Sequence, residues 1–225
     1  MKKIVNLHPK VDQNLVNEFR KLKNALSLSC VVADSMERDN VMCSEIKIRT
    51  SSEKFIGPAL TVKLYPGDLV DCLEALKIAE PGDVIVVDAH GETETSVWGG
   101  MMSSLCKVKG VVGAVVDGAI RDTDETRMIG FPVASKAIVP RSTHSPYSKR
   151  MEPIEINVPI HCGGVLVRPG DIVVADEIGV VVVPIEDAPQ VLKEAKARAE
   201  AEEKTRNRIS QGKTVEELLA EFGRL

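Results

Sequence analysis

Two uninterrupted runs of small and β-branched residues limit the folds that are open to this chain. Val84–Val87 and Val111–Val116 contain no charged or hydrogen-bonding side chain. A strand with one face in water alternates apolar and polar residues, whereas a continuous apolar run is typical of a strand buried on both faces. Each run therefore needs a covering layer on both sides, which favours a layered α/β domain.

Further strands and helices are predicted around these two runs. The residue patterns predict helices over 69–79 and 101–109, and strands over 57–64 and 132–138. Short strand-like segments then crowd residues 165–183. Strands that alternate with helices and later follow one another closely are expected in a mixed α/β domain.

Helices are also predicted at both ends of the chain. Apolar residues recur at helical spacing between residues 11 and 26, and 186–208 reads as a long charged helix with a thin apolar stripe. We therefore expect one domain over 1–225, with an N-terminal helix at about 11–26 and a C-terminal helical arm at about 186–225. The arm is too polar for a core, so it is either a solvated surface or a cover for a neighbouring subunit.

Composition argues against several classes of function. The chain has 225 residues, 44% of them hydrophobic, which is enough for one full-sized domain. A net charge of −4 without a basic stripe argues against nucleic-acid binding. No apolar run approaches the roughly 20 residues that span a membrane, and no secretion signal is visible. Widely spaced cysteines without a CxxC pair suit a reducing compartment, so we expect a cytoplasmic protein.

A glycine pair before a predicted helix forms the first candidate site. Gly99 and Gly100 let a ligand approach the backbone closely, and the N–H groups of Met101 and Met102 would face an anion with help from the helix dipole. A carboxylate would suit such a site as well as a phosphate. The alternative is a tight turn whose glycines serve packing alone.

An Arg-Asp pair after the second buried run forms the next candidate. Val116 leads through a glycine turn to Arg121 and Asp122, and ligands of α/β proteins bind beyond the carboxyl ends of strands. Arg121 offers a planar fork for a carboxylate or an enolate oxygen. Asp122 offers a hard oxygen ligand for Mg²⁺ or Mn²⁺. The alternative is a surface ion pair without a function.

Polar residues after the first buried run give a weaker candidate. Asp88, His90, Glu92 and Glu94 are compatible with the rim of a site, although such a cluster is more often a solvated loop. The other histidines are too scattered for a zinc site. The sequence contains no GxSxG, HExxH, P-loop or GxGxxG motif.

Together these segments resemble the RraA-like family, which includes metal-dependent 4-hydroxy-4-methyl-2-oxoglutarate aldolases. The resemblance covers about residues 30–210 and is carried, in this order, by Gly57–Val62, Pro81–Asp88, Trp98–Gly100, Gly110–Asp122, Pro169–Asp176 and Gly179–Pro184. It implies a layered α/β/β/α sandwich of the swivelling phosphohistidine-domain type. It also implies a homotrimer or a hexamer of paired trimers, with the site between subunits.

The resemblance also implies roles for the candidate residues. In the aldolases the Arg binds pyruvate, the adjacent Asp holds the divalent metal through water, and backbone amides after the glycine turn grip the pyruvate carboxylate. Carried over to this chain, Arg121 and Asp122 are catalytic and Asp122 holds Mg²⁺ or Mn²⁺. The residues expected to bind the substrate are Gly99, Gly100, Met101, Met102 and Arg121.

Position 100 departs from the family pattern. The aldolases carry an acidic residue at the position that corresponds to Gly100, where it helps to hold the metal and its water. We therefore expect either weaker metal binding or other groups that complete the metal shell. A Glu on the C-terminal helix of a neighbouring chain contributes in the family, and Glu202 or Glu203 is the expected match.

Two functions follow from the resemblance. The first is a metal-dependent aldolase that acts on 4-hydroxy-4-methyl-2-oxoglutarate or a related 2-oxo acid, releases pyruvate through an enolate, and can decarboxylate oxaloacetate by the same chemistry. The second is a non-catalytic regulator that binds a ribonuclease. Asp122 and Arg121 favour the enzyme, whereas Gly100 favours the regulator. A methyltransferase, a name sometimes attached to such sequences, would need a glycine-rich nucleotide loop that we do not find.

Overall fold

The computed structural model describes residues 3–66, 70, 72–143, 152 and 154–223. The strands are β1 (Ile4–Val5), β2 (Lys47–Ile48), β3 (Phe55–Lys63), β4 (Val84–Trp98), β5 (Gly113–Ile120), β6 (Val133–Ile138), β7 (Glu155–Ile156), β8 (Ile160–Cys162), β9 (Val165–Val167), β10 (Ile172–Ala175) and β11 (Val180–Val183). The helices are α1 (Gln13–Lys21), α2 (Leu28–Asp34), α3 (Gly100–Lys109), α4 (Thr123–Met128), α6 (Ala188–Ser210), α7 (Val215–Phe222) and the 3₁₀ turns η1 (Leu22–Asn24) and η2 (Cys72–Lys77).

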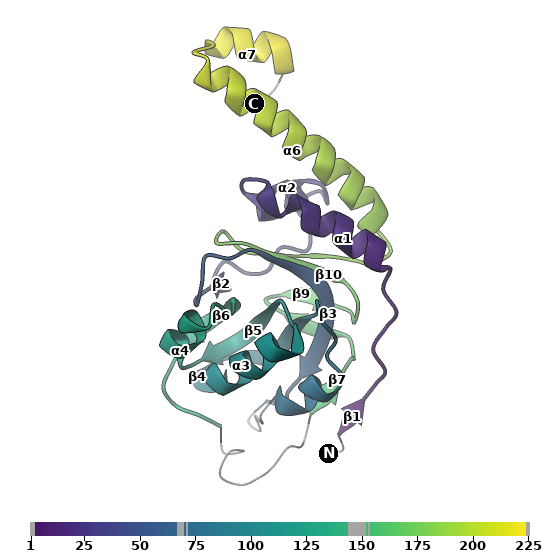
Figure 1. Ribbon diagram of the computed structural model, residues 1–225, viewed down its shortest axis with the longest axis vertical. Coiled ribbons are helices and arrows are strands. Elements are labelled where there is room, and N and C mark those ends of the chain that lie inside the picture. The colour runs from purple at the N-terminus through teal and green to yellow at the C-terminus, as the bar shows by residue number, and fades with distance from the viewer. Residues whose placement is uncertain (1–2, 67–69, 71, 144–151, 153, 224–225) are drawn as a thin grey trace.

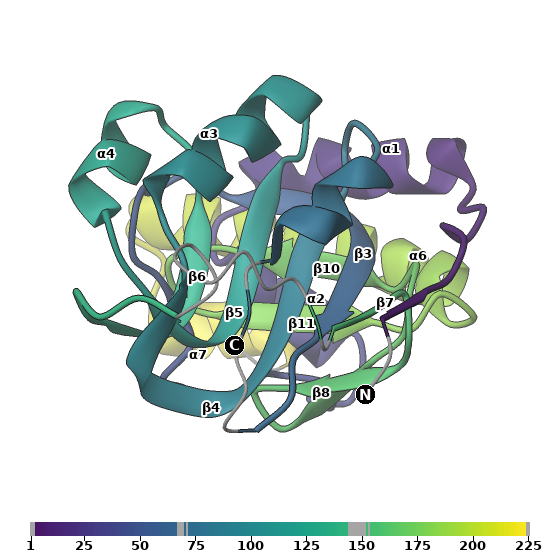
Figure 2. The ribbon, with the colours of Figure 1, turned by 90° about the horizontal axis from the view of Figure 1, so that it is seen from below.

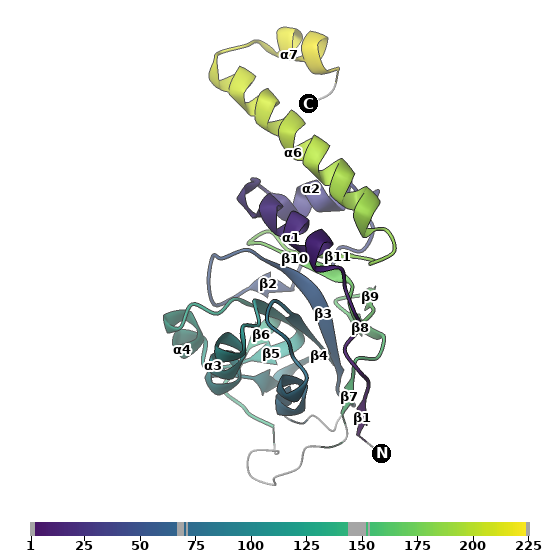
Figure 3. The same ribbon diagram turned by 45° about the vertical axis from the view of Figure 1, so that its right-hand side comes forward.

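These elements form layers (Figures 2 and 3). A cluster of buried apolar side chains fills each space between neighbouring layers. Helices α3 and α4, with η2, cover one face of the sheet that contains β3 to β6. Strands β8 to β11 cover its other face, and α1, α2 and α6 in turn cover β10 and β11. The predicted mixed α/β fold is therefore confirmed, with the layers in the order α/β/β/α.

Each apolar run contributes side chains to two of these buried clusters at once. Along β4, Val84 and Val86 face the other β layer, while Ile85 and Val87 face the layer of α3. The segment Val180–Val183 in β11 alternates in the same way, between the β layers and the outer helices. Because each position faces a dry interior, each adds about 1.5–3 kcal/mol by burial, and a polar side chain there would lose its water.

Parallel pairing decides where the ends of the strands lie. Strands β3, β4, β5 and β6 run parallel as neighbours in that order. Parallel neighbours need a crossover connection, and α3 and α4 provide those between β4 and β5 and between β5 and β6. The carboxyl ends of β4 and β5 therefore meet at one edge of the sheet. Gly99 and Gly100 come directly after the end of β4, and Arg121 and Asp122 come directly after the end of β5.

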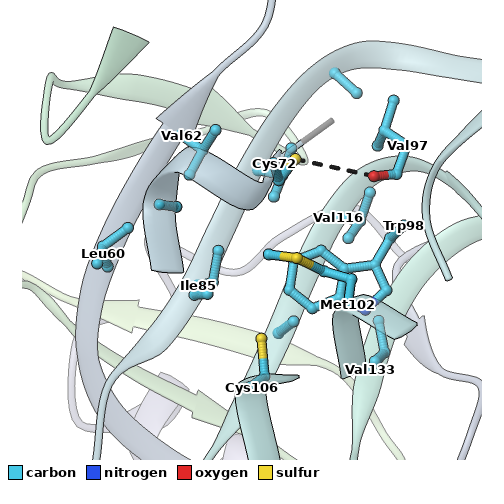
Figure 4. Packing of buried hydrophobic residues seen from close by; sticks show 14 of the residues in the cluster. Leu60, Val62, Cys72, Ile85, Val97, Trp98, Met102, Cys106, Val116 and Val133 are labelled. Atoms are coloured by element: carbon cyan, nitrogen blue, oxygen red, sulfur yellow. Dashed lines mark hydrogen bonds between the residues drawn. The ribbon is translucent and has the colours of Figure 1, made fainter. Parts of the chain in front are cut away.

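The core beneath α3 fixes the end of β4 (Figure 4). Trp98, Met102 and Cys106 belong to one buried cluster with Ile85 and Val116 of the sheet. Trp98 is only 2% exposed although it is the last residue of β4. Because its ring is held in the core, the backbone that follows it is held as well.

Strand β4 is longer than predicted. His90, Glu92 and Glu94, for which a solvated loop was the favoured interpretation over the rim of a site, belong together with Asp88 to β4, which continues to Trp98. His90 has a φ of 55°, and the register of β4 against β5 shifts after Asp88. The chain bends at this point and then resumes its pairing with β5, so the loop prediction was wrong. The sequence, which is rich in Pro, Ser, His and Arg over residues 140–153, also predicts a loop there, but most of those residues lie outside the described part of the chain.

Helix α6 leaves the body of the protein (Figure 1). Its first half packs on α1 and α2 through buried Val191, Leu192 and Ala195. Most of its second half is exposed or half-buried, and α7 folds back on its end. Neither α6 nor any other helix in the described part of the chain is long and apolar enough to cross a membrane.

His8 fastens the N-terminal segment to the turn before β4. Its Nε2 lies 2.9 Å from Oδ2 of the buried Asp83, and its Nδ1 lies 2.9 Å from the carbonyl oxygen of Pro9. The hydrogen bond with Asp83 raises the pKa of His8 from 6.5 to about 9. A raised pKa in the folded state stabilises the fold fully below pH 6.5, and this contribution is lost as the pH rises through 9.

The His8 contact makes stability depend on pH. We expect the unfolding free energy of the wild-type protein, relative to His8→Gln, to fall by about 1–2 kcal/mol between roughly pH 6 and pH 9.5. This figure is smaller than the full pKa shift implies, because the ring keeps some contact with solvent. Urea denaturation of both proteins at the two pH values measures it. The same pH dependence in both proteins would contradict the prediction.

Candidate functional site

Two segments meet where β4 and β5 end. Trp98 and Ile120 are paired in register, and the N–H of Arg121 donates to the carbonyl oxygen of Trp98 at 2.9 Å. Gly99 and Gly100, which follow β4, therefore lie beside the Arg-Asp pair that follows β5. The structure brings the two main candidates from the sequence into one site.

Asp122 has a backbone conformation that few residues other than glycine adopt, with a φ of 52°. It is the N-cap residue of α4, yet its side chain makes no capping hydrogen bond to that helix. Its Oδ2 instead accepts a hydrogen bond from the N–H of Gly100 at 3.2 Å and lies 3.5 Å from Nε of Arg121. Backbone strain of this kind clusters at functional sites.

Gly99 leaves space for the Asp122 carboxylate. A Cβ atom at position 99 would lie 2.6 Å from Oδ2 of Asp122, and 3.3 Å and 3.4 Å from Cγ and Nε of Arg121. The backbone of Gly99 is extended, with a φ of −151° that any residue can adopt. The site therefore needs glycine here for space and not for backbone freedom.

The first turn of α3 offers backbone donors to the site. Asp122 takes the N–H of Gly100, and the N–H of Ser103 bonds to the carbonyl of Gly99. The N–H groups of Met101 and Met102 have no acceptor among the described residues, as helix geometry requires for a first turn. Together with the helix dipole, these donors suit a carboxylate or another anion.

A cavity of about 530 Å³ lies over these groups. The side chains of Arg121 and Asp122 are 37% and 41% exposed, so both are accessible from it. Its lining combines apolar side chains, among them Leu73, Trp98 and Met101, with the charged side chains of Arg121, Asp122 and Glu125. A volume in this range is usual for a small-molecule site.

Comparison with known proteins shows the family. The sequence model of the RraA-like family, described as Aldolase/RraA, matches residues 29–182. The chain belongs to the RraA-like family. A relative from Halalkalibacterium halodurans, provisionally named as a 4-hydroxy-4-methyl-2-oxoglutarate aldolase, is 36% identical over 195 residues, which are 87% of this chain and 88% of the relative.

Two further RraA-like relatives bear on function. A Thermus thermophilus protein named 4-hydroxy-4-methyl-2-oxoglutarate aldolase is 31% identical over 131 residues, 58% of this chain and 76% of the relative. The solved structure of Streptomyces coelicolor RraAS2, described as an unusual member of the RNase ES inhibitor RraA protein family, matches with a TM-score of 0.74 and 30% identity. That match covers 88% of this chain and 100% of RraAS2.

The donor atoms of this RraA-like site fit a hard divalent cation. Asp122 and Glu125 line the same cavity, and carboxylate oxygens are the ligands that Mg²⁺ and Mn²⁺ prefer. Within the described residues, no three His, Cys, Asp or Glu side chains are grouped as a complete metal site. Mg²⁺ commonly binds through one or two carboxylates and takes its other ligands from water and substrate. Two carboxylates that line one cavity satisfy that requirement.

The predicted C-terminal metal ligands lie elsewhere in the same chain. Glu202 and Glu203 line a separate groove of about 520 Å³ between α6 and η1, and Glu202 pairs with Arg206. Neither of them lines the cavity that contains Asp122. The expectation that a neighbouring chain supplies one of them stays a prediction.

A buried hydrogen-bond network behind the site was missed by the sequence reasoning. Ser103 Oγ accepts hydrogen bonds from Trp98 Nε1 at 2.9 Å and from Thr126 Oγ1 at 3.3 Å, and it donates to the carbonyl oxygen of Gly99 at 3.1 Å. The network ties α3 and α4 to the end of β4, which holds Gly99 and Asp122 in place. The only signal for this network in the sequence was the presence of two polar residues, Ser103 and Thr126, each within a short helix.

Proposed function

We propose that this RraA-like protein is a divalent-metal-dependent lyase that cleaves 4-hydroxy-4-methyl-2-oxoglutarate, or a related 2-oxo acid, and releases pyruvate. The observation that carries the proposal is the placement of Arg121, Asp122 and the first turn of α3 around one cavity. A 2-oxo acid and its enolate need three kinds of group: a carboxylate that holds a cation, a guanidinium, and backbone N–H groups that are free to donate. The names of the H. halodurans and T. thermophilus relatives support the same reaction.

Substrate binding relies on the positive groups of the site. The N–H groups of Met101 and Met102 donate to the substrate carboxylate, with the α3 dipole adding to the attraction. The Arg121 guanidinium binds the oxygen of the 2-oxo group. Asp122 holds Mg²⁺ or Mn²⁺, which supplies Lewis-acid polarisation of the substrate when it is bound.

Cleavage starts at the C4 hydroxyl group of the substrate. When this group gives its proton to a water molecule oriented by Asp122, the bond between C3 and C4 breaks and the C4 half leaves as pyruvate. The electron pair of that bond passes to the enolate of the remaining three carbons, and Arg121 stabilises its negative oxygen. A water molecule oriented by Asp122 protonates C3 and gives the second pyruvate. Oxaloacetate would form the same enolate by losing CO₂, so we expect decarboxylation as well.

We also propose a homotrimer, or a dimer of trimers, in which α6 of one chain completes the site of another. The second half of α6 extends away from its own body and carries Glu202 and Glu203 (Figure 1). Ile209, Val215 and Leu219 in this region are 53%, 59% and 46% exposed. Exposed apolar residues of this kind favour contact with another chain.

Pyruvate release tests the proposed reaction. Full-length protein is incubated with 4-hydroxy-4-methyl-2-oxoglutarate or with oxaloacetate, in Mg²⁺ or Mn²⁺ and then in EDTA. We expect release with metal and a loss of at least about 10²-fold in EDTA, because the Lewis acid contributes several kcal/mol to such reactions. A folded protein that releases no pyruvate from either substrate would contradict the proposal.

A non-catalytic regulator that binds a ribonuclease is the second candidate function. The structural similarity to S. coelicolor RraAS2, which is described as belonging to an RNase inhibitor family, favours it. This function predicts no metal-dependent turnover and a stable complex with a ribonuclease. The pyruvate assay therefore separates the two candidates.

A further inference from the structure

The carboxylate of Glu125 occupies the space above Gly100. Glu125 lies in the first turn of α4, and Gly100 is the first residue of α3. A Cβ atom at position 100 would overlap Oε2 of Glu125 and would lie 2.9 Å from its Oε1. A side chain at position 100 and the observed position of Glu125 therefore exclude each other.

The position of Glu125 over Gly100 replaces a local contact that its spacing from Asp122 would predict. Asp122 and Glu125 have the spacing of a capping box, in which each side chain bonds to the backbone N–H of the other residue. Thr214 and Glu217 have the same spacing at the start of α7 and form the complete box, with hydrogen bonds of 3.3 Å and 2.9 Å. In α4 the Asp122 side chain makes no capping bond. Asp122 and Glu125 instead line the cavity.

The two carboxylates lie over adjacent residues of one backbone segment. The Asp122 carboxylate lies over Gly99 and the Glu125 carboxylate lies over Gly100. Two neighbouring negative groups repel each other unless a positive charge stands between or beside them. Arg121 lies on one side, with its Nε 3.5 Å from Asp122. A divalent cation bound by both carboxylates would offset the remaining repulsion.

We propose that Glu125 is the second carboxylate of the cation site and acts with Asp122 from the space above Gly100. The inference rests on the proposed function, because it concerns the same Mg²⁺ or Mn²⁺ site. The proposal also explains glycine at position 100, because only a residue without a side chain leaves space there for the Glu125 carboxylate from α4. The acidic side chain that the family resemblance leads us to expect at position 100 is then supplied by a residue 25 positions later in the chain.

Direct Mn²⁺ binding tests the assignment without any measurement of turnover. The electron paramagnetic resonance signal of free Mn²⁺ is followed during titration of the full-length protein. We expect the Kd of Glu125→Ala to rise by about 10-fold or more, and that of Asp122→Asn to rise by at least as much. Asn is chosen at position 122 because it tolerates the left-handed backbone there.

Asp124→Ala is the matched control. Asp124 precedes Glu125 in the first turn of α4, so both variants lose a similar helix-dipole interaction and both gain alanine. Asp124 does not line the cavity, and we expect its variant to bind Mn²⁺ as the wild-type protein does. Fluorescence of Trp98, the single tryptophan, checks that each variant is folded around the site.

A charge-relocation variant tests the shared position. Gly100→Asp combined with Glu125→Ala places a carboxylate in the vacated space from the α3 side. We expect this double variant to bind Mn²⁺ at least about 10-fold more tightly than Glu125→Ala alone. If it does not, Glu125 does not act from the space above Gly100.

The outcomes separate this inference from the proposed function. If the wild-type protein binds no Mn²⁺, the proposed metal-dependent function fails. If Asp122→Asn weakens binding while Glu125→Ala matches the wild-type protein, the metal site stands and the role of Glu125 is overturned.

Discussion

Replacement of Arg121 by alanine should lower kcat/KM for pyruvate release by about 10³-fold, the upper part of the range for removing one preorganised charge-stabilising group. The N–H bond from Arg121 to Trp98 fixes its backbone, and its side chain lines the cavity. The alanine variant would leave the enolate oxygen without its protein cation. Steady-state kinetics with saturating metal measures the effect.

Two further variants separate charge stabilisation from a general loss of structure. Arg121→Lys keeps the charge but loses the planar fork, so we expect an intermediate loss of about 10- to 10²-fold. Arg127→Ala is the control, because Arg127 is an exposed arginine on α4 that does not line the cavity, and its hydrogen bond within the described residues goes to the carbonyl oxygen of Arg49, at 3.4 Å. It should retain wild-type activity. If Arg121→Ala stays within a few-fold of wild type, the assigned role is wrong.

The buried strands could be predicted from the sequence because their patterns allow one interpretation. Val84–Val87 and Val180–Val183 are continuous apolar runs, and the structure buries both faces of each. The continuation of β4 beyond Asp88 could not be predicted in this way. Its polar residues pair with β5 only after a bend at His90, and such a bend depends on the neighbouring strand.

The parts of the site that follow directly from strand ends could also be predicted. Arg121 and Asp122 lie at the end of β5 and beside Gly99, as the rule for α/β sheets requires. Glu125 was missed because, four residues after Arg121 in a short helix, it has the pattern of an ordinary capping residue. Only the packing of α4 against α3 turns it toward Gly100.

Gly99→Ala should reduce both Mn²⁺ affinity and turnover by about 10- to 10²-fold, as expected for a residue that positions a metal ligand. The new Cβ would lie 2.6 Å from Oδ2 of Asp122, so this short side chain must rotate away from the N–H of Gly100. The backbone is not strained, because alanine readily adopts the extended conformation at position 99. Loss of the hydrogen bond from the N–H of Gly100, in the first turn of α3, to Asp122 should cost only about 1 kcal/mol of stability, which leaves the protein folded at assay temperature.

Gly179→Ala is the control for adding a methyl group at a glycine. A Cβ at position 179 would meet nothing closer than Nζ of Lys47, at 3.9 Å, and Gly179 does not line the cavity. We expect it to bind Mn²⁺ and release pyruvate as the wild-type protein does. Loss of both properties in Gly99→Ala, with both kept in Gly179→Ala, would assign the effect to the displaced Asp122 carboxylate. Wild-type Mn²⁺ affinity in Gly99→Ala would show that the position of Asp122 seen here is not required for metal binding.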